Sequence, residues 1–307
     1  MAPRQPDLSA GVAYIDGEFG PIAEASVPIL DLGFLRSDAT YDVVAVWNGK
    51  FFRLDRHLDR FFRGLEKLRL ELPVDRDGLT RVLADCVRRA GLDEAYVEVV
   101  ATRGLPVAGS RDIRLCVNRM YCFAIPYVWI ATAEQRERGI RLVVGETERI
   151  SNRSVDPRIK NYHWLDFEQA LLSAYDAGGD NVVLADGKGL ITEGAGFNVF
   201  VVRDGVLATP ATNVLEGITR RTVLDIAREI GIPCEVGEVT VDALRTADEA
   251  FGASTAGGIF FVTSVDGRAL ADGRAGPLTR RIHDTYWAWH DDARFTLAVA
   301  DVPPFEG

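Results

Sequence analysis

At residues 157–164 the chain reads Pro157-Arg158-Ile159-Lys160-Asn161-Tyr162-His163-Trp164, which contains one of only four lysines among 35 basic residues. The other three lysines have ordinary settings, since Lys50 and Lys188 lie in Gly-containing turns and Lys67 lies on an amphipathic helical run. Lys160 has no turn chemistry after it and is followed by an aromatic pair and a predicted helix. A lysine that can lose its proton in such a place is a candidate Schiff-base nucleophile. The alternative is a solvated loop lysine, and segments further along the chain decide between the two.

The amino-acid composition is typical of a folded protein, and acidic residues outnumber basic ones. The 307 residues have 47% hydrophobic and 26% charged side chains, which is enough for one large or two modest domains. The net charge of −10 argues against nucleic acid and anionic membrane surfaces as partners. The longest apolar run, Met120–Ala133, is too short to span a bilayer and contains Pro126.

The N-terminal segment Met1–Asp7 has no apolar signal core, and the cysteines have no spacing typical of a metal site or a disulfide framework. We therefore expect a cytoplasmic protein without a bound metal. The four cysteines are Cys86, Cys116, Cys122 and Cys234.

Hydrophobic periodicity predicts a mixed α/β or α+β chain with two unequal domains. The first third reads as strands flanking helices at 54–70 and 77–90, with further strands at 95–102 and 114–125. The remainder alternates short strands with helices at 164–177, 218–229 and 277–289. We place the small domain at 1–128, a polar linker at 129–139 and the large domain at 140–307.

A carboxylate stands between a short apolar strand and a Gly-x-Gly turn, at Glu193 in the run Leu190–Phe200. Such a carboxylate can be held against a pyridine nitrogen, which keeps the nitrogen protonated and lets the ring accept electrons. Gly194 and Gly196 would let the backbone approach a flat ring closely. The alternative is a turn carboxylate in water.

Three further segments have features of anion binding. Gly217 precedes a helix with a clear apolar period, so the N–H groups of Ile218 and Thr219 and the Thr219 hydroxyl are available to an anion. The alternative is an ordinary helix start, which has the same sequence pattern. The small-residue segment 252–258 contains two hydroxyls, at Ser254 and Thr255, and can form an anion nest or a plain flexible turn.

Arg60 provides the third feature. It lies one helical turn after His57 and can grip a phosphate with two nitrogens. The alternative is a surface ion pair with Asp59 or Glu66.

Together and in this order, the segments resemble the fold-type IV family of pyridoxal-phosphate enzymes, with the likeness running from about Val12 to about Trp289. The resembling motifs are His57-Leu58-Asp59-Arg60, Ile159-Lys160-Asn161, Glu193-Gly194-Ala195-Gly196-Phe197-Asn198, Leu215-Glu216-Gly217-Ile218-Thr219-Arg220 and Ser254-Thr255-Ala256-Gly257-Gly258.

The resemblance implies a smaller N-terminal α/β domain, a larger domain with a barrel-like sheet, bound pyridoxal 5'-phosphate and a homodimer. It also implies that Lys160 forms the internal aldimine and that Glu193 pairs with the pyridinium. The phosphate would be held by Arg60, Ile218, Thr219, Ser254 and Thr255.

Within the family, the chain is most similar to the (R)-selective amine transaminases, in the runs 37–43, 51–55, 97–104 and 159–164. Strand alternation puts Tyr41, Val43 and Ala45 on one face of their strand, and likewise Tyr96 and Glu98 on one face of theirs. We expect both faces to line the substrate pocket, together with Trp164 and Ala256. Branched-chain aminotransferases have an arginine where Glu98 stands and bind a substrate carboxylate with it, whereas a glutamate should repel that carboxylate.

The carboxylate-binding arginine differs from the amine-transaminase pattern. Those enzymes often have a histidine where Arg36 stands, and an arginine in the loop after Thr102-Arg103-Gly104, where the nearest match here is Ala108. This leaves Arg36 and Arg111 as candidates, with a surface pair between Arg36 and Asp38 as the alternative.

We therefore predict a transaminase that moves the amino group of an (R)-amine to a keto acid such as pyruvate, through an aldimine on Lys160 and a ketimine. The alternatives are a D-amino acid aminotransferase, a branched-chain aminotransferase and a fold-type IV lyase. A cofactor-binding protein without catalysis belongs to a different class.

Overall fold

The computed structural model describes residues 10–306, so the segment Met1–Asp7 considered above lies outside the described residues. The chain divides into two compact units. Unit 1 contains the chain up to Val128, together with Ile159–Tyr162 and the segment after Asp292. Unit 2 contains Trp129–Arg158 and His163–Asp291.

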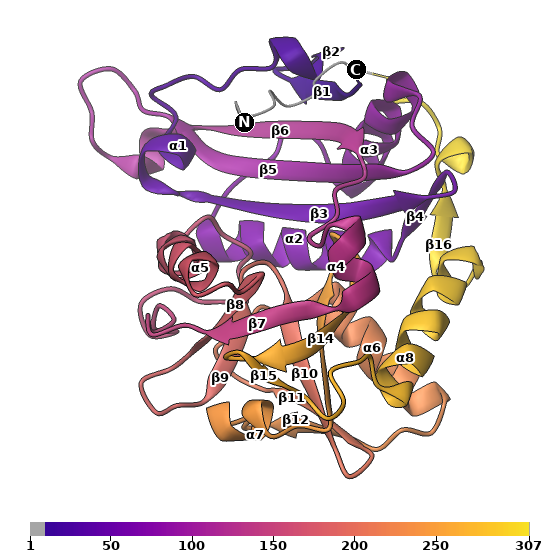
Figure 1. Cartoon of the computed structure of the whole chain (residues 1–307). Coiled ribbons are helices and arrows are strands. Elements are labelled where there is room, and N and C mark those ends of the chain that lie inside the picture. The colour runs from indigo at the N-terminus through magenta and orange to yellow at the C-terminus, as the bar shows by residue number, and fades with distance from the viewer. Residues whose placement is uncertain (1–9, 307) are drawn as a thin grey trace, which may run out of the picture. The chain divides into compact units, whose positions relative to one another are not determined.

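Unit 1 is a seven-stranded sheet in the order β16-β4-β3-β5-β6-β1-β2, with every neighbouring pair antiparallel. The strands are β1 (Val12–Ile15), β2 (Glu18–Pro21), β3 (Ala39–Trp47), β4 (Lys50–Phe52), β5 (Ala95–Leu105), β6 (Val117–Pro126) and β16 (Thr296–Ala298). The helices are α1 (Leu32–Arg36), α2 (Leu54–Leu68) and α3 (Arg76–Ala90). Figure 1 shows this sheet with its long central strands β3, β5 and β6.

One face of this sheet carries the core of unit 1. Helices α2 and α3 pack on it and bury alternate apolar residues of the strands, such as Val44 and Val46 on β3 and Val97 and Val99 on β5. Because side chains alternate along a strand, the intervening residues of β3 and β5 point to the opposite face. The predicted substrate residues are among these intervening positions.

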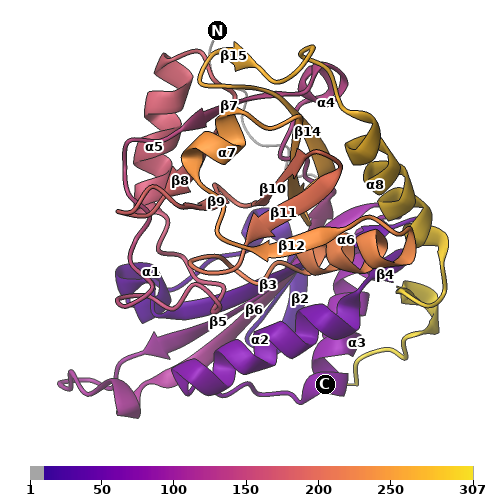
Figure 2. The same cartoon turned by 90° about the horizontal axis from the view of Figure 1, so that it is seen from below.

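Unit 2 is built on a nine-stranded mixed sheet in the order β12-β11-β10-β13-β14-β7-β8-β9, with β15 paired to β14. Its pairs β11–β12, β14–β7 and β7–β8 are parallel. The strands are β7 (Ile140–Val144), β8 (Asn181–Ala185), β9 (Ile191–Gly194), β10 (Asn198–Arg203), β11 (Val206–Pro210), β12 (Cys234–Gly237), β13 (Glu249–Ser254), β14 (Gly258–Val265) and β15 (Arg268–Ala269). The helices are α4 (Ala133–Arg138), α5 (Leu165–Asp176), α6 (Ile218–Glu229), α7 (Val241–Arg245) and α8 (Pro277–Ala288). Figure 2 shows this sheet curling on itself.

The predicted fold class is confirmed, since an antiparallel sheet in unit 1 is accompanied by a curled, barrel-like sheet in unit 2. The predicted domain boundaries stay a prediction. The segment predicted as a linker belongs to unit 2 and contains α4, which begins with a reciprocal cap between Thr132 and Gln135. Two segments that we assigned to the large domain, Ile159–Tyr162 and the chain after Asp292, belong to unit 1.

Two predicted element ends were wrong for local reasons. The predicted helix 54–70 ends at Leu68, because Arg69 takes a left-handed conformation with φ 53°. The predicted strand at 114–125 begins at Val117, because Ile113–Leu115 forms a short 3-10 turn capped by the Asp112 carboxylate. No described helix has the length and apolar character needed to cross a membrane.

Candidate functional site

The segment with Lys160 is attached to β3 in unit 1. The Lys160 carbonyl oxygen accepts hydrogen bonds from the Tyr41 N–H, at 3.1 Å, and from the Thr40 hydroxyl, at 2.9 Å. The Lys160 Nζ lies 4.2 Å from the centroid of the Tyr41 ring, in reach of a cation–π interaction. Two tertiary hydrogen bonds therefore fix the backbone of this lysine, and the residue is half-buried.

Two tyrosines and a glutamate surround this lysine. The Tyr41 and Tyr162 rings are stacked, with centroids 4.3 Å apart and planes 4° from parallel. The Tyr162 hydroxyl donates a hydrogen bond of 2.9 Å to Glu98 Oε1. Burial raises the pKa of Glu98, while the Tyr162 hydrogen bond and the charge of Lys160 act in the opposite direction. Lys160 thus lies in an aromatic setting that contains a buried carboxylate, with Glu98 8% exposed.

The register of β3 and β5 groups the predicted substrate residues. Val43 pairs with Glu98, and Ala45 pairs with Tyr96. Directly paired residues of antiparallel strands lie on the same face of a sheet, so these side chains share the face of Tyr41. Whether this face lines a substrate pocket stays a prediction.

The other face of β3 carries a buried charged triad. Asp42 accepts a hydrogen bond of 2.8 Å from each of Arg60 Nε and Arg60 Nη2, and its Oδ1 lies 2.7 Å from His57 Nδ1. Burial alone would raise the pKa of Asp42, but the Arg60 charge and the His57 hydrogen bond outweigh it and hold that pKa well below its usual range. Burial lowers the pKa of His57, so the imidazole is neutral at pH 7. The alternative partners considered for Arg60, Asp59 and Glu66, are wrong.

The two candidate carboxylate-binding arginines are both exposed. Arg36 is the last residue of α1, and Arg111 lies in the loop between β5 and β6. The surface pair considered for Arg36 is wrong, because Asp38 is bound by Arg103 Nε at 3.0 Å and Nη2 at 3.2 Å.

In unit 2, Glu193 lies on β9 and is 7% exposed, so the interpretation of a turn carboxylate in water is wrong. Its Oε2 accepts a hydrogen bond of 2.8 Å from the Leu215 N–H. Its Oε1 lies 3.4 Å from Arg149 Nη2. Gly194, next in the chain, has no room for a side chain, because a Cβ there would meet the Phe197 ring.

The predicted anion-binding residues of unit 2 lie at the start of α6 and after β13. Ile218 and Thr219 begin α6, and the preceding Gly217 provides no side-chain cap. The N–H groups of this first turn are therefore not bonded by a capping side chain. A Cβ on Gly217 would meet the Asn198 amide oxygen, so a larger residue here would require the Asn198 side chain to move.

The hydroxyl of Ser254 is already used within unit 2, since it donates to the Gly196 carbonyl at 2.8 Å. It also accepts from the Ala256 N–H at 3.2 Å, which holds the turn that contains the half-buried Thr255. Trp164 is the residue before α5 and packs on Phe167, with ring centroids 5.7 Å apart.

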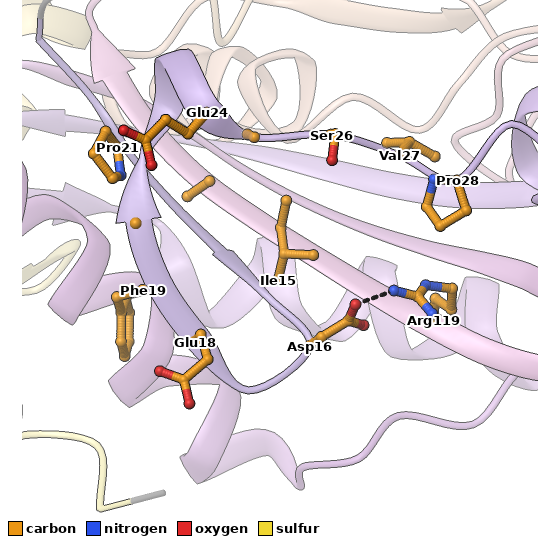
Figure 3. A pocket seen from close by; sticks show the side chains of 13 residues that line it. Ile15, Asp16, Glu18, Phe19, Pro21, Glu24, Ser26, Val27, Pro28 and Arg119 are labelled. Carbon is orange, nitrogen blue, oxygen red and sulfur yellow. Dashed lines mark hydrogen bonds and ion pairs between the residues drawn. The ribbon is translucent and has the colours of Figure 1, made fainter.

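A separate groove in unit 1 follows the edge hairpin of β1 and β2 (Figure 3). Asp16, Glu18 and Glu24 lie along it, and Arg119 forms an ion pair with Asp16. None of the predicted site residues lines this groove.

Comparison with known proteins decides the family. The family model "Amino-transferase class IV" matches residues 39–265. The chain belongs to the class IV aminotransferases. It is 32% identical over 276 residues to a putative branched-chain-amino-acid aminotransferase of Methanocaldococcus jannaschii, covering 89% of this chain and 94% of the relative. It is also 32% identical over 270 residues to D-alanine aminotransferase of Listeria monocytogenes, covering 86% of this chain and 90% of that protein.

A solved class IV relative has the same fold. The branched-chain amino acid aminotransferase of Thermobaculum terrenum, crystallised in its holo form with pyridoxal phosphate, superposes with a TM-score of 0.83 at 26% identity. The match covers 94% of this chain and 98% of that structure. The predicted aminotransferase activity is thereby confirmed, whereas the finer assignment to (R)-amines is not supported by these relatives.

The residues present suit a pyridoxal-phosphate cofactor. Glu193 is a buried carboxylate, and a carboxylate oxygen accepts more than one hydrogen bond, so Glu193 can accept a ring N–H besides its bonds to Leu215 and Arg149. The uncapped first turn of α6 suits a phosphate. Lys160 supplies an amine within an aromatic setting. Taken one at a time, these groups have the chemistry to bind the ring nitrogen, the phosphate and the aldehyde of this cofactor.

Sequence reasoning missed four residues that form contacts in these sites. Asp42 could have been found from the sequence, because it is the one charged residue within the largely apolar run Thr40–Trp47. Tyr162 could also have been found, as an aromatic residue two positions after Lys160. Arg149 and Asp166 could not, since 17 residues separate them and only the folded chain brings them together.

Proposed function

We propose that the protein is a pyridoxal-phosphate-dependent transaminase that moves the amino group of an (R)-amine to a keto acid such as pyruvate. The family assignment supports transamination. The observation that carries the choice of amine is the buried carboxylate of Glu98, which lies on the same strand face as Tyr96 and is bonded to Tyr162.

Each proposed role follows from the chemistry of a residue in place. When bound, pyridoxal phosphate supplies an aldehyde that condenses with amines and a ring that stores electrons. Lys160 would carry the cofactor and act as the base that takes the proton from the amine-bearing carbon of the donor. Glu193 would hold a proton on the ring nitrogen. The phosphate would be bound by Arg60, Ile218, Thr219 and Thr255, with the Ser254 hydroxyl holding the turn that contains Thr255.

Glu98 distinguishes a donor without a carboxylate from an amino acid. A carboxylate of the substrate placed near Glu98 would face a like charge or force one of the two groups to bind a proton, and either change costs free energy. Tyr41, Val43 and Ala45 supply apolar surface on the same face of the sheet. Apolar surface beside a buried carboxylate favours an amine with an apolar substituent over an α-amino acid.

The carboxylate of the keto acid needs a cation to bind it. That cation must be in the pocket during the keto-acid half-reaction and outside it during the amine half-reaction. Arg36 and Arg111 are exposed, and the loop of Arg111 contains Gly109, which has φ 76°. An arginine on such a segment can bind the carboxylate of pyruvate and leave when the amine binds. We propose that one of these two arginines has this role.

The test is a panel of half-reactions on the cofactor-loaded protein, followed by the absorbance of the cofactor. (R)-1-phenylethylamine should convert the cofactor at least as fast as D-alanine, and (S)-1-phenylethylamine and L-leucine should be poor donors. A protein that uses L-leucine and ignores both phenylethylamines would be a branched-chain aminotransferase, and our account of Glu98 would be wrong. A strong preference for D-alanine would instead indicate a D-amino acid aminotransferase, with Arg36 as the candidate carboxylate ligand.

We also propose that the active unit is a homodimer. Large apolar side chains are exposed in two segments of unit 1, around α1 and in the connection from β5 to β6. They are Val27, Ile29, Leu30, Phe34 and Leu35 in the first segment and Val107, Ile113, Leu115 and Val117 in the second. Several large exposed apolar side chains gathered in two segments are a feature of interfaces. Sedimentation with activity detection tests the proposal, and a fully active monomer would contradict it.

A further inference from the structure

A buried arginine in unit 2 contacts two carboxylates, those of Asp166 and Glu193. Arg149 Nη1 lies 2.7 Å from Asp166 Oδ2, and Arg149 Nη2 lies 3.4 Å from Glu193 Oε1. The three side chains are 7%, 14% and 9% exposed, in the order Arg149, Asp166, Glu193. Little water is therefore present to screen the charges.

Arg149 is held in place by more than its ion pairs. Its N–H donates to the Ala185 carbonyl at 3.0 Å, and its guanidinium lies 4.3 Å from the centroid of the Phe167 ring. The buried Nε has no hydrogen-bond partner among the described residues. The side chain is thus bonded through its two terminal nitrogens, and both of them contact a carboxylate.

The two carboxylates share the cation unequally. Asp166 has the short contact, and its oxygens also accept from the N–H groups of Ile150 and Phe167, at 2.8 and 2.9 Å. Glu193 has a contact near the outer limit of a hydrogen bond, and its firm bond is to the Leu215 N–H. The other buried arginine in electrostatic range, Arg220, donates instead to the Pro210 carbonyl at 2.8 Å. Glu193 is therefore oriented by Arg149 without being tightly paired with it.

We propose that Arg149 and Asp166 are positioning residues that set how much negative charge Glu193 presents to a protonated ring nitrogen. Asp166 draws the guanidinium away from Glu193, and the remaining long contact keeps Glu193 Oε1 in place. Removing the charge of Asp166 lets the guanidinium pivot about its chain and pair tightly with Glu193, which then binds a ring N–H more weakly. Lysine cannot replace Arg149, because a single ammonium does not span both carboxylates as the planar fork does. This inference rests on the proposed cofactor.

The experiment measures affinity, not turnover. Apoprotein is titrated with pyridoxal phosphate and with its 1-deaza analogue, in which a carbon replaces the ring nitrogen, and the ratio of the two dissociation constants reports the contact to that nitrogen. Asp166→Asn and Arg149→Lys are compared with the wild type. The matched control is Asp180→Asn. Like Asp166, Asp180 is a buried carboxylate of unit 2 that pairs with arginine, in its case Arg138 and Arg141, but it has no contact with Glu193.

The wild type should prefer pyridoxal phosphate over the deaza analogue. The preference should fall about tenfold in both Asp166→Asn and Arg149→Lys, as for the loss of one charge-assisted hydrogen bond, and stay unchanged in Asp180→Asn. Variants that only lose thermal stability, with the wild-type preference kept, would show a structural role and overturn the inference. A wild type that binds both compounds equally well would also overturn it, and one that binds neither would refute the proposed function itself.

Discussion

Replacing Asp42 with asparagine removes the only anion from the buried triad on β3. Asp42 is bound by His57 at 2.7 Å and by two nitrogens of Arg60 at 2.8 Å. The side chains of these three residues are at most 5% exposed. Asparagine has nearly the same shape, so the change leaves the packing intact and removes the Asp42 carboxylate from the buried Arg60 guanidinium.

The expected loss in the free energy of unfolding is about 3–5 kcal/mol at pH 7, the cost of removing one partner of a buried ion pair. The loss should depend on pH. Because the folded-state pKa of Asp42 is lowered, its contribution is present above the unfolded pKa of about 4 and disappears as pH falls through the folded pKa. The difference between wild type and Asp42→Asn should therefore narrow as pH is lowered below about 4.

Urea unfolding of the apoprotein, followed by circular dichroism, measures this difference. Asp38→Asn is the control, because Asp38 forms a comparable pair with Arg103 in which Arg103 is 11% and Asp38 22% exposed, and its loss should cost about 1 kcal/mol or less. Equal losses in the two variants, or a loss in Asp42→Asn that does not change with pH, would refute the reasoning.

Five other substitutions have definite expected outcomes. Since burial raises the pKa of Glu98, its ionised form is disfavoured in the fold, so Glu98→Gln should gain stability relative to wild type as pH rises from about 4 to about 8 in urea unfolding. Glu193→Gln should keep the thermal stability of the apoprotein but lower turnover steeply, and unchanged steady-state rates would show that Glu193 has no role in catalysis. Arg60→Ala should weaken cofactor binding by about 2–5 kcal/mol in equilibrium titration, if it leaves a buried phosphate unpaired. Arg36→Ala or Arg111→Ala should raise the KM for pyruvate and spare the (R)-amine half-reaction, and normal pyruvate kinetics in both would place the carboxylate site elsewhere.

Sequence patterns predicted the elements whose residues repeat with a clear period. The helix at 218–229 has the predicted bounds. The short elements α1, α4 and α7 were not predicted, because five or six residues give too little periodicity to read.

Side-chain partners were harder to predict than elements. The position of Glu193 at the end of a strand and of Gly217 before a helix could be predicted, because the neighbouring residues in the sequence determine where strands end and helices begin. The partners of Arg60 and Glu98 lie 18 and 64 positions away, on a neighbouring strand and in an irregular segment. Strand register and loop conformation decide such contacts, and both depend on the packing of the whole unit.

The identity of the cofactor-bearing lysine tests the central claim most directly. The chain has only Lys50, Lys67, Lys160 and Lys188. Borohydride reduction of the cofactor-loaded protein, followed by peptide mass spectrometry, identifies the lysine that carries a pyridoxyl group. We predict the added mass on the peptide that contains Lys160, and its loss in Lys160→Ala. A pyridoxyl group on any of the other three lysines, or on none, would contradict the account.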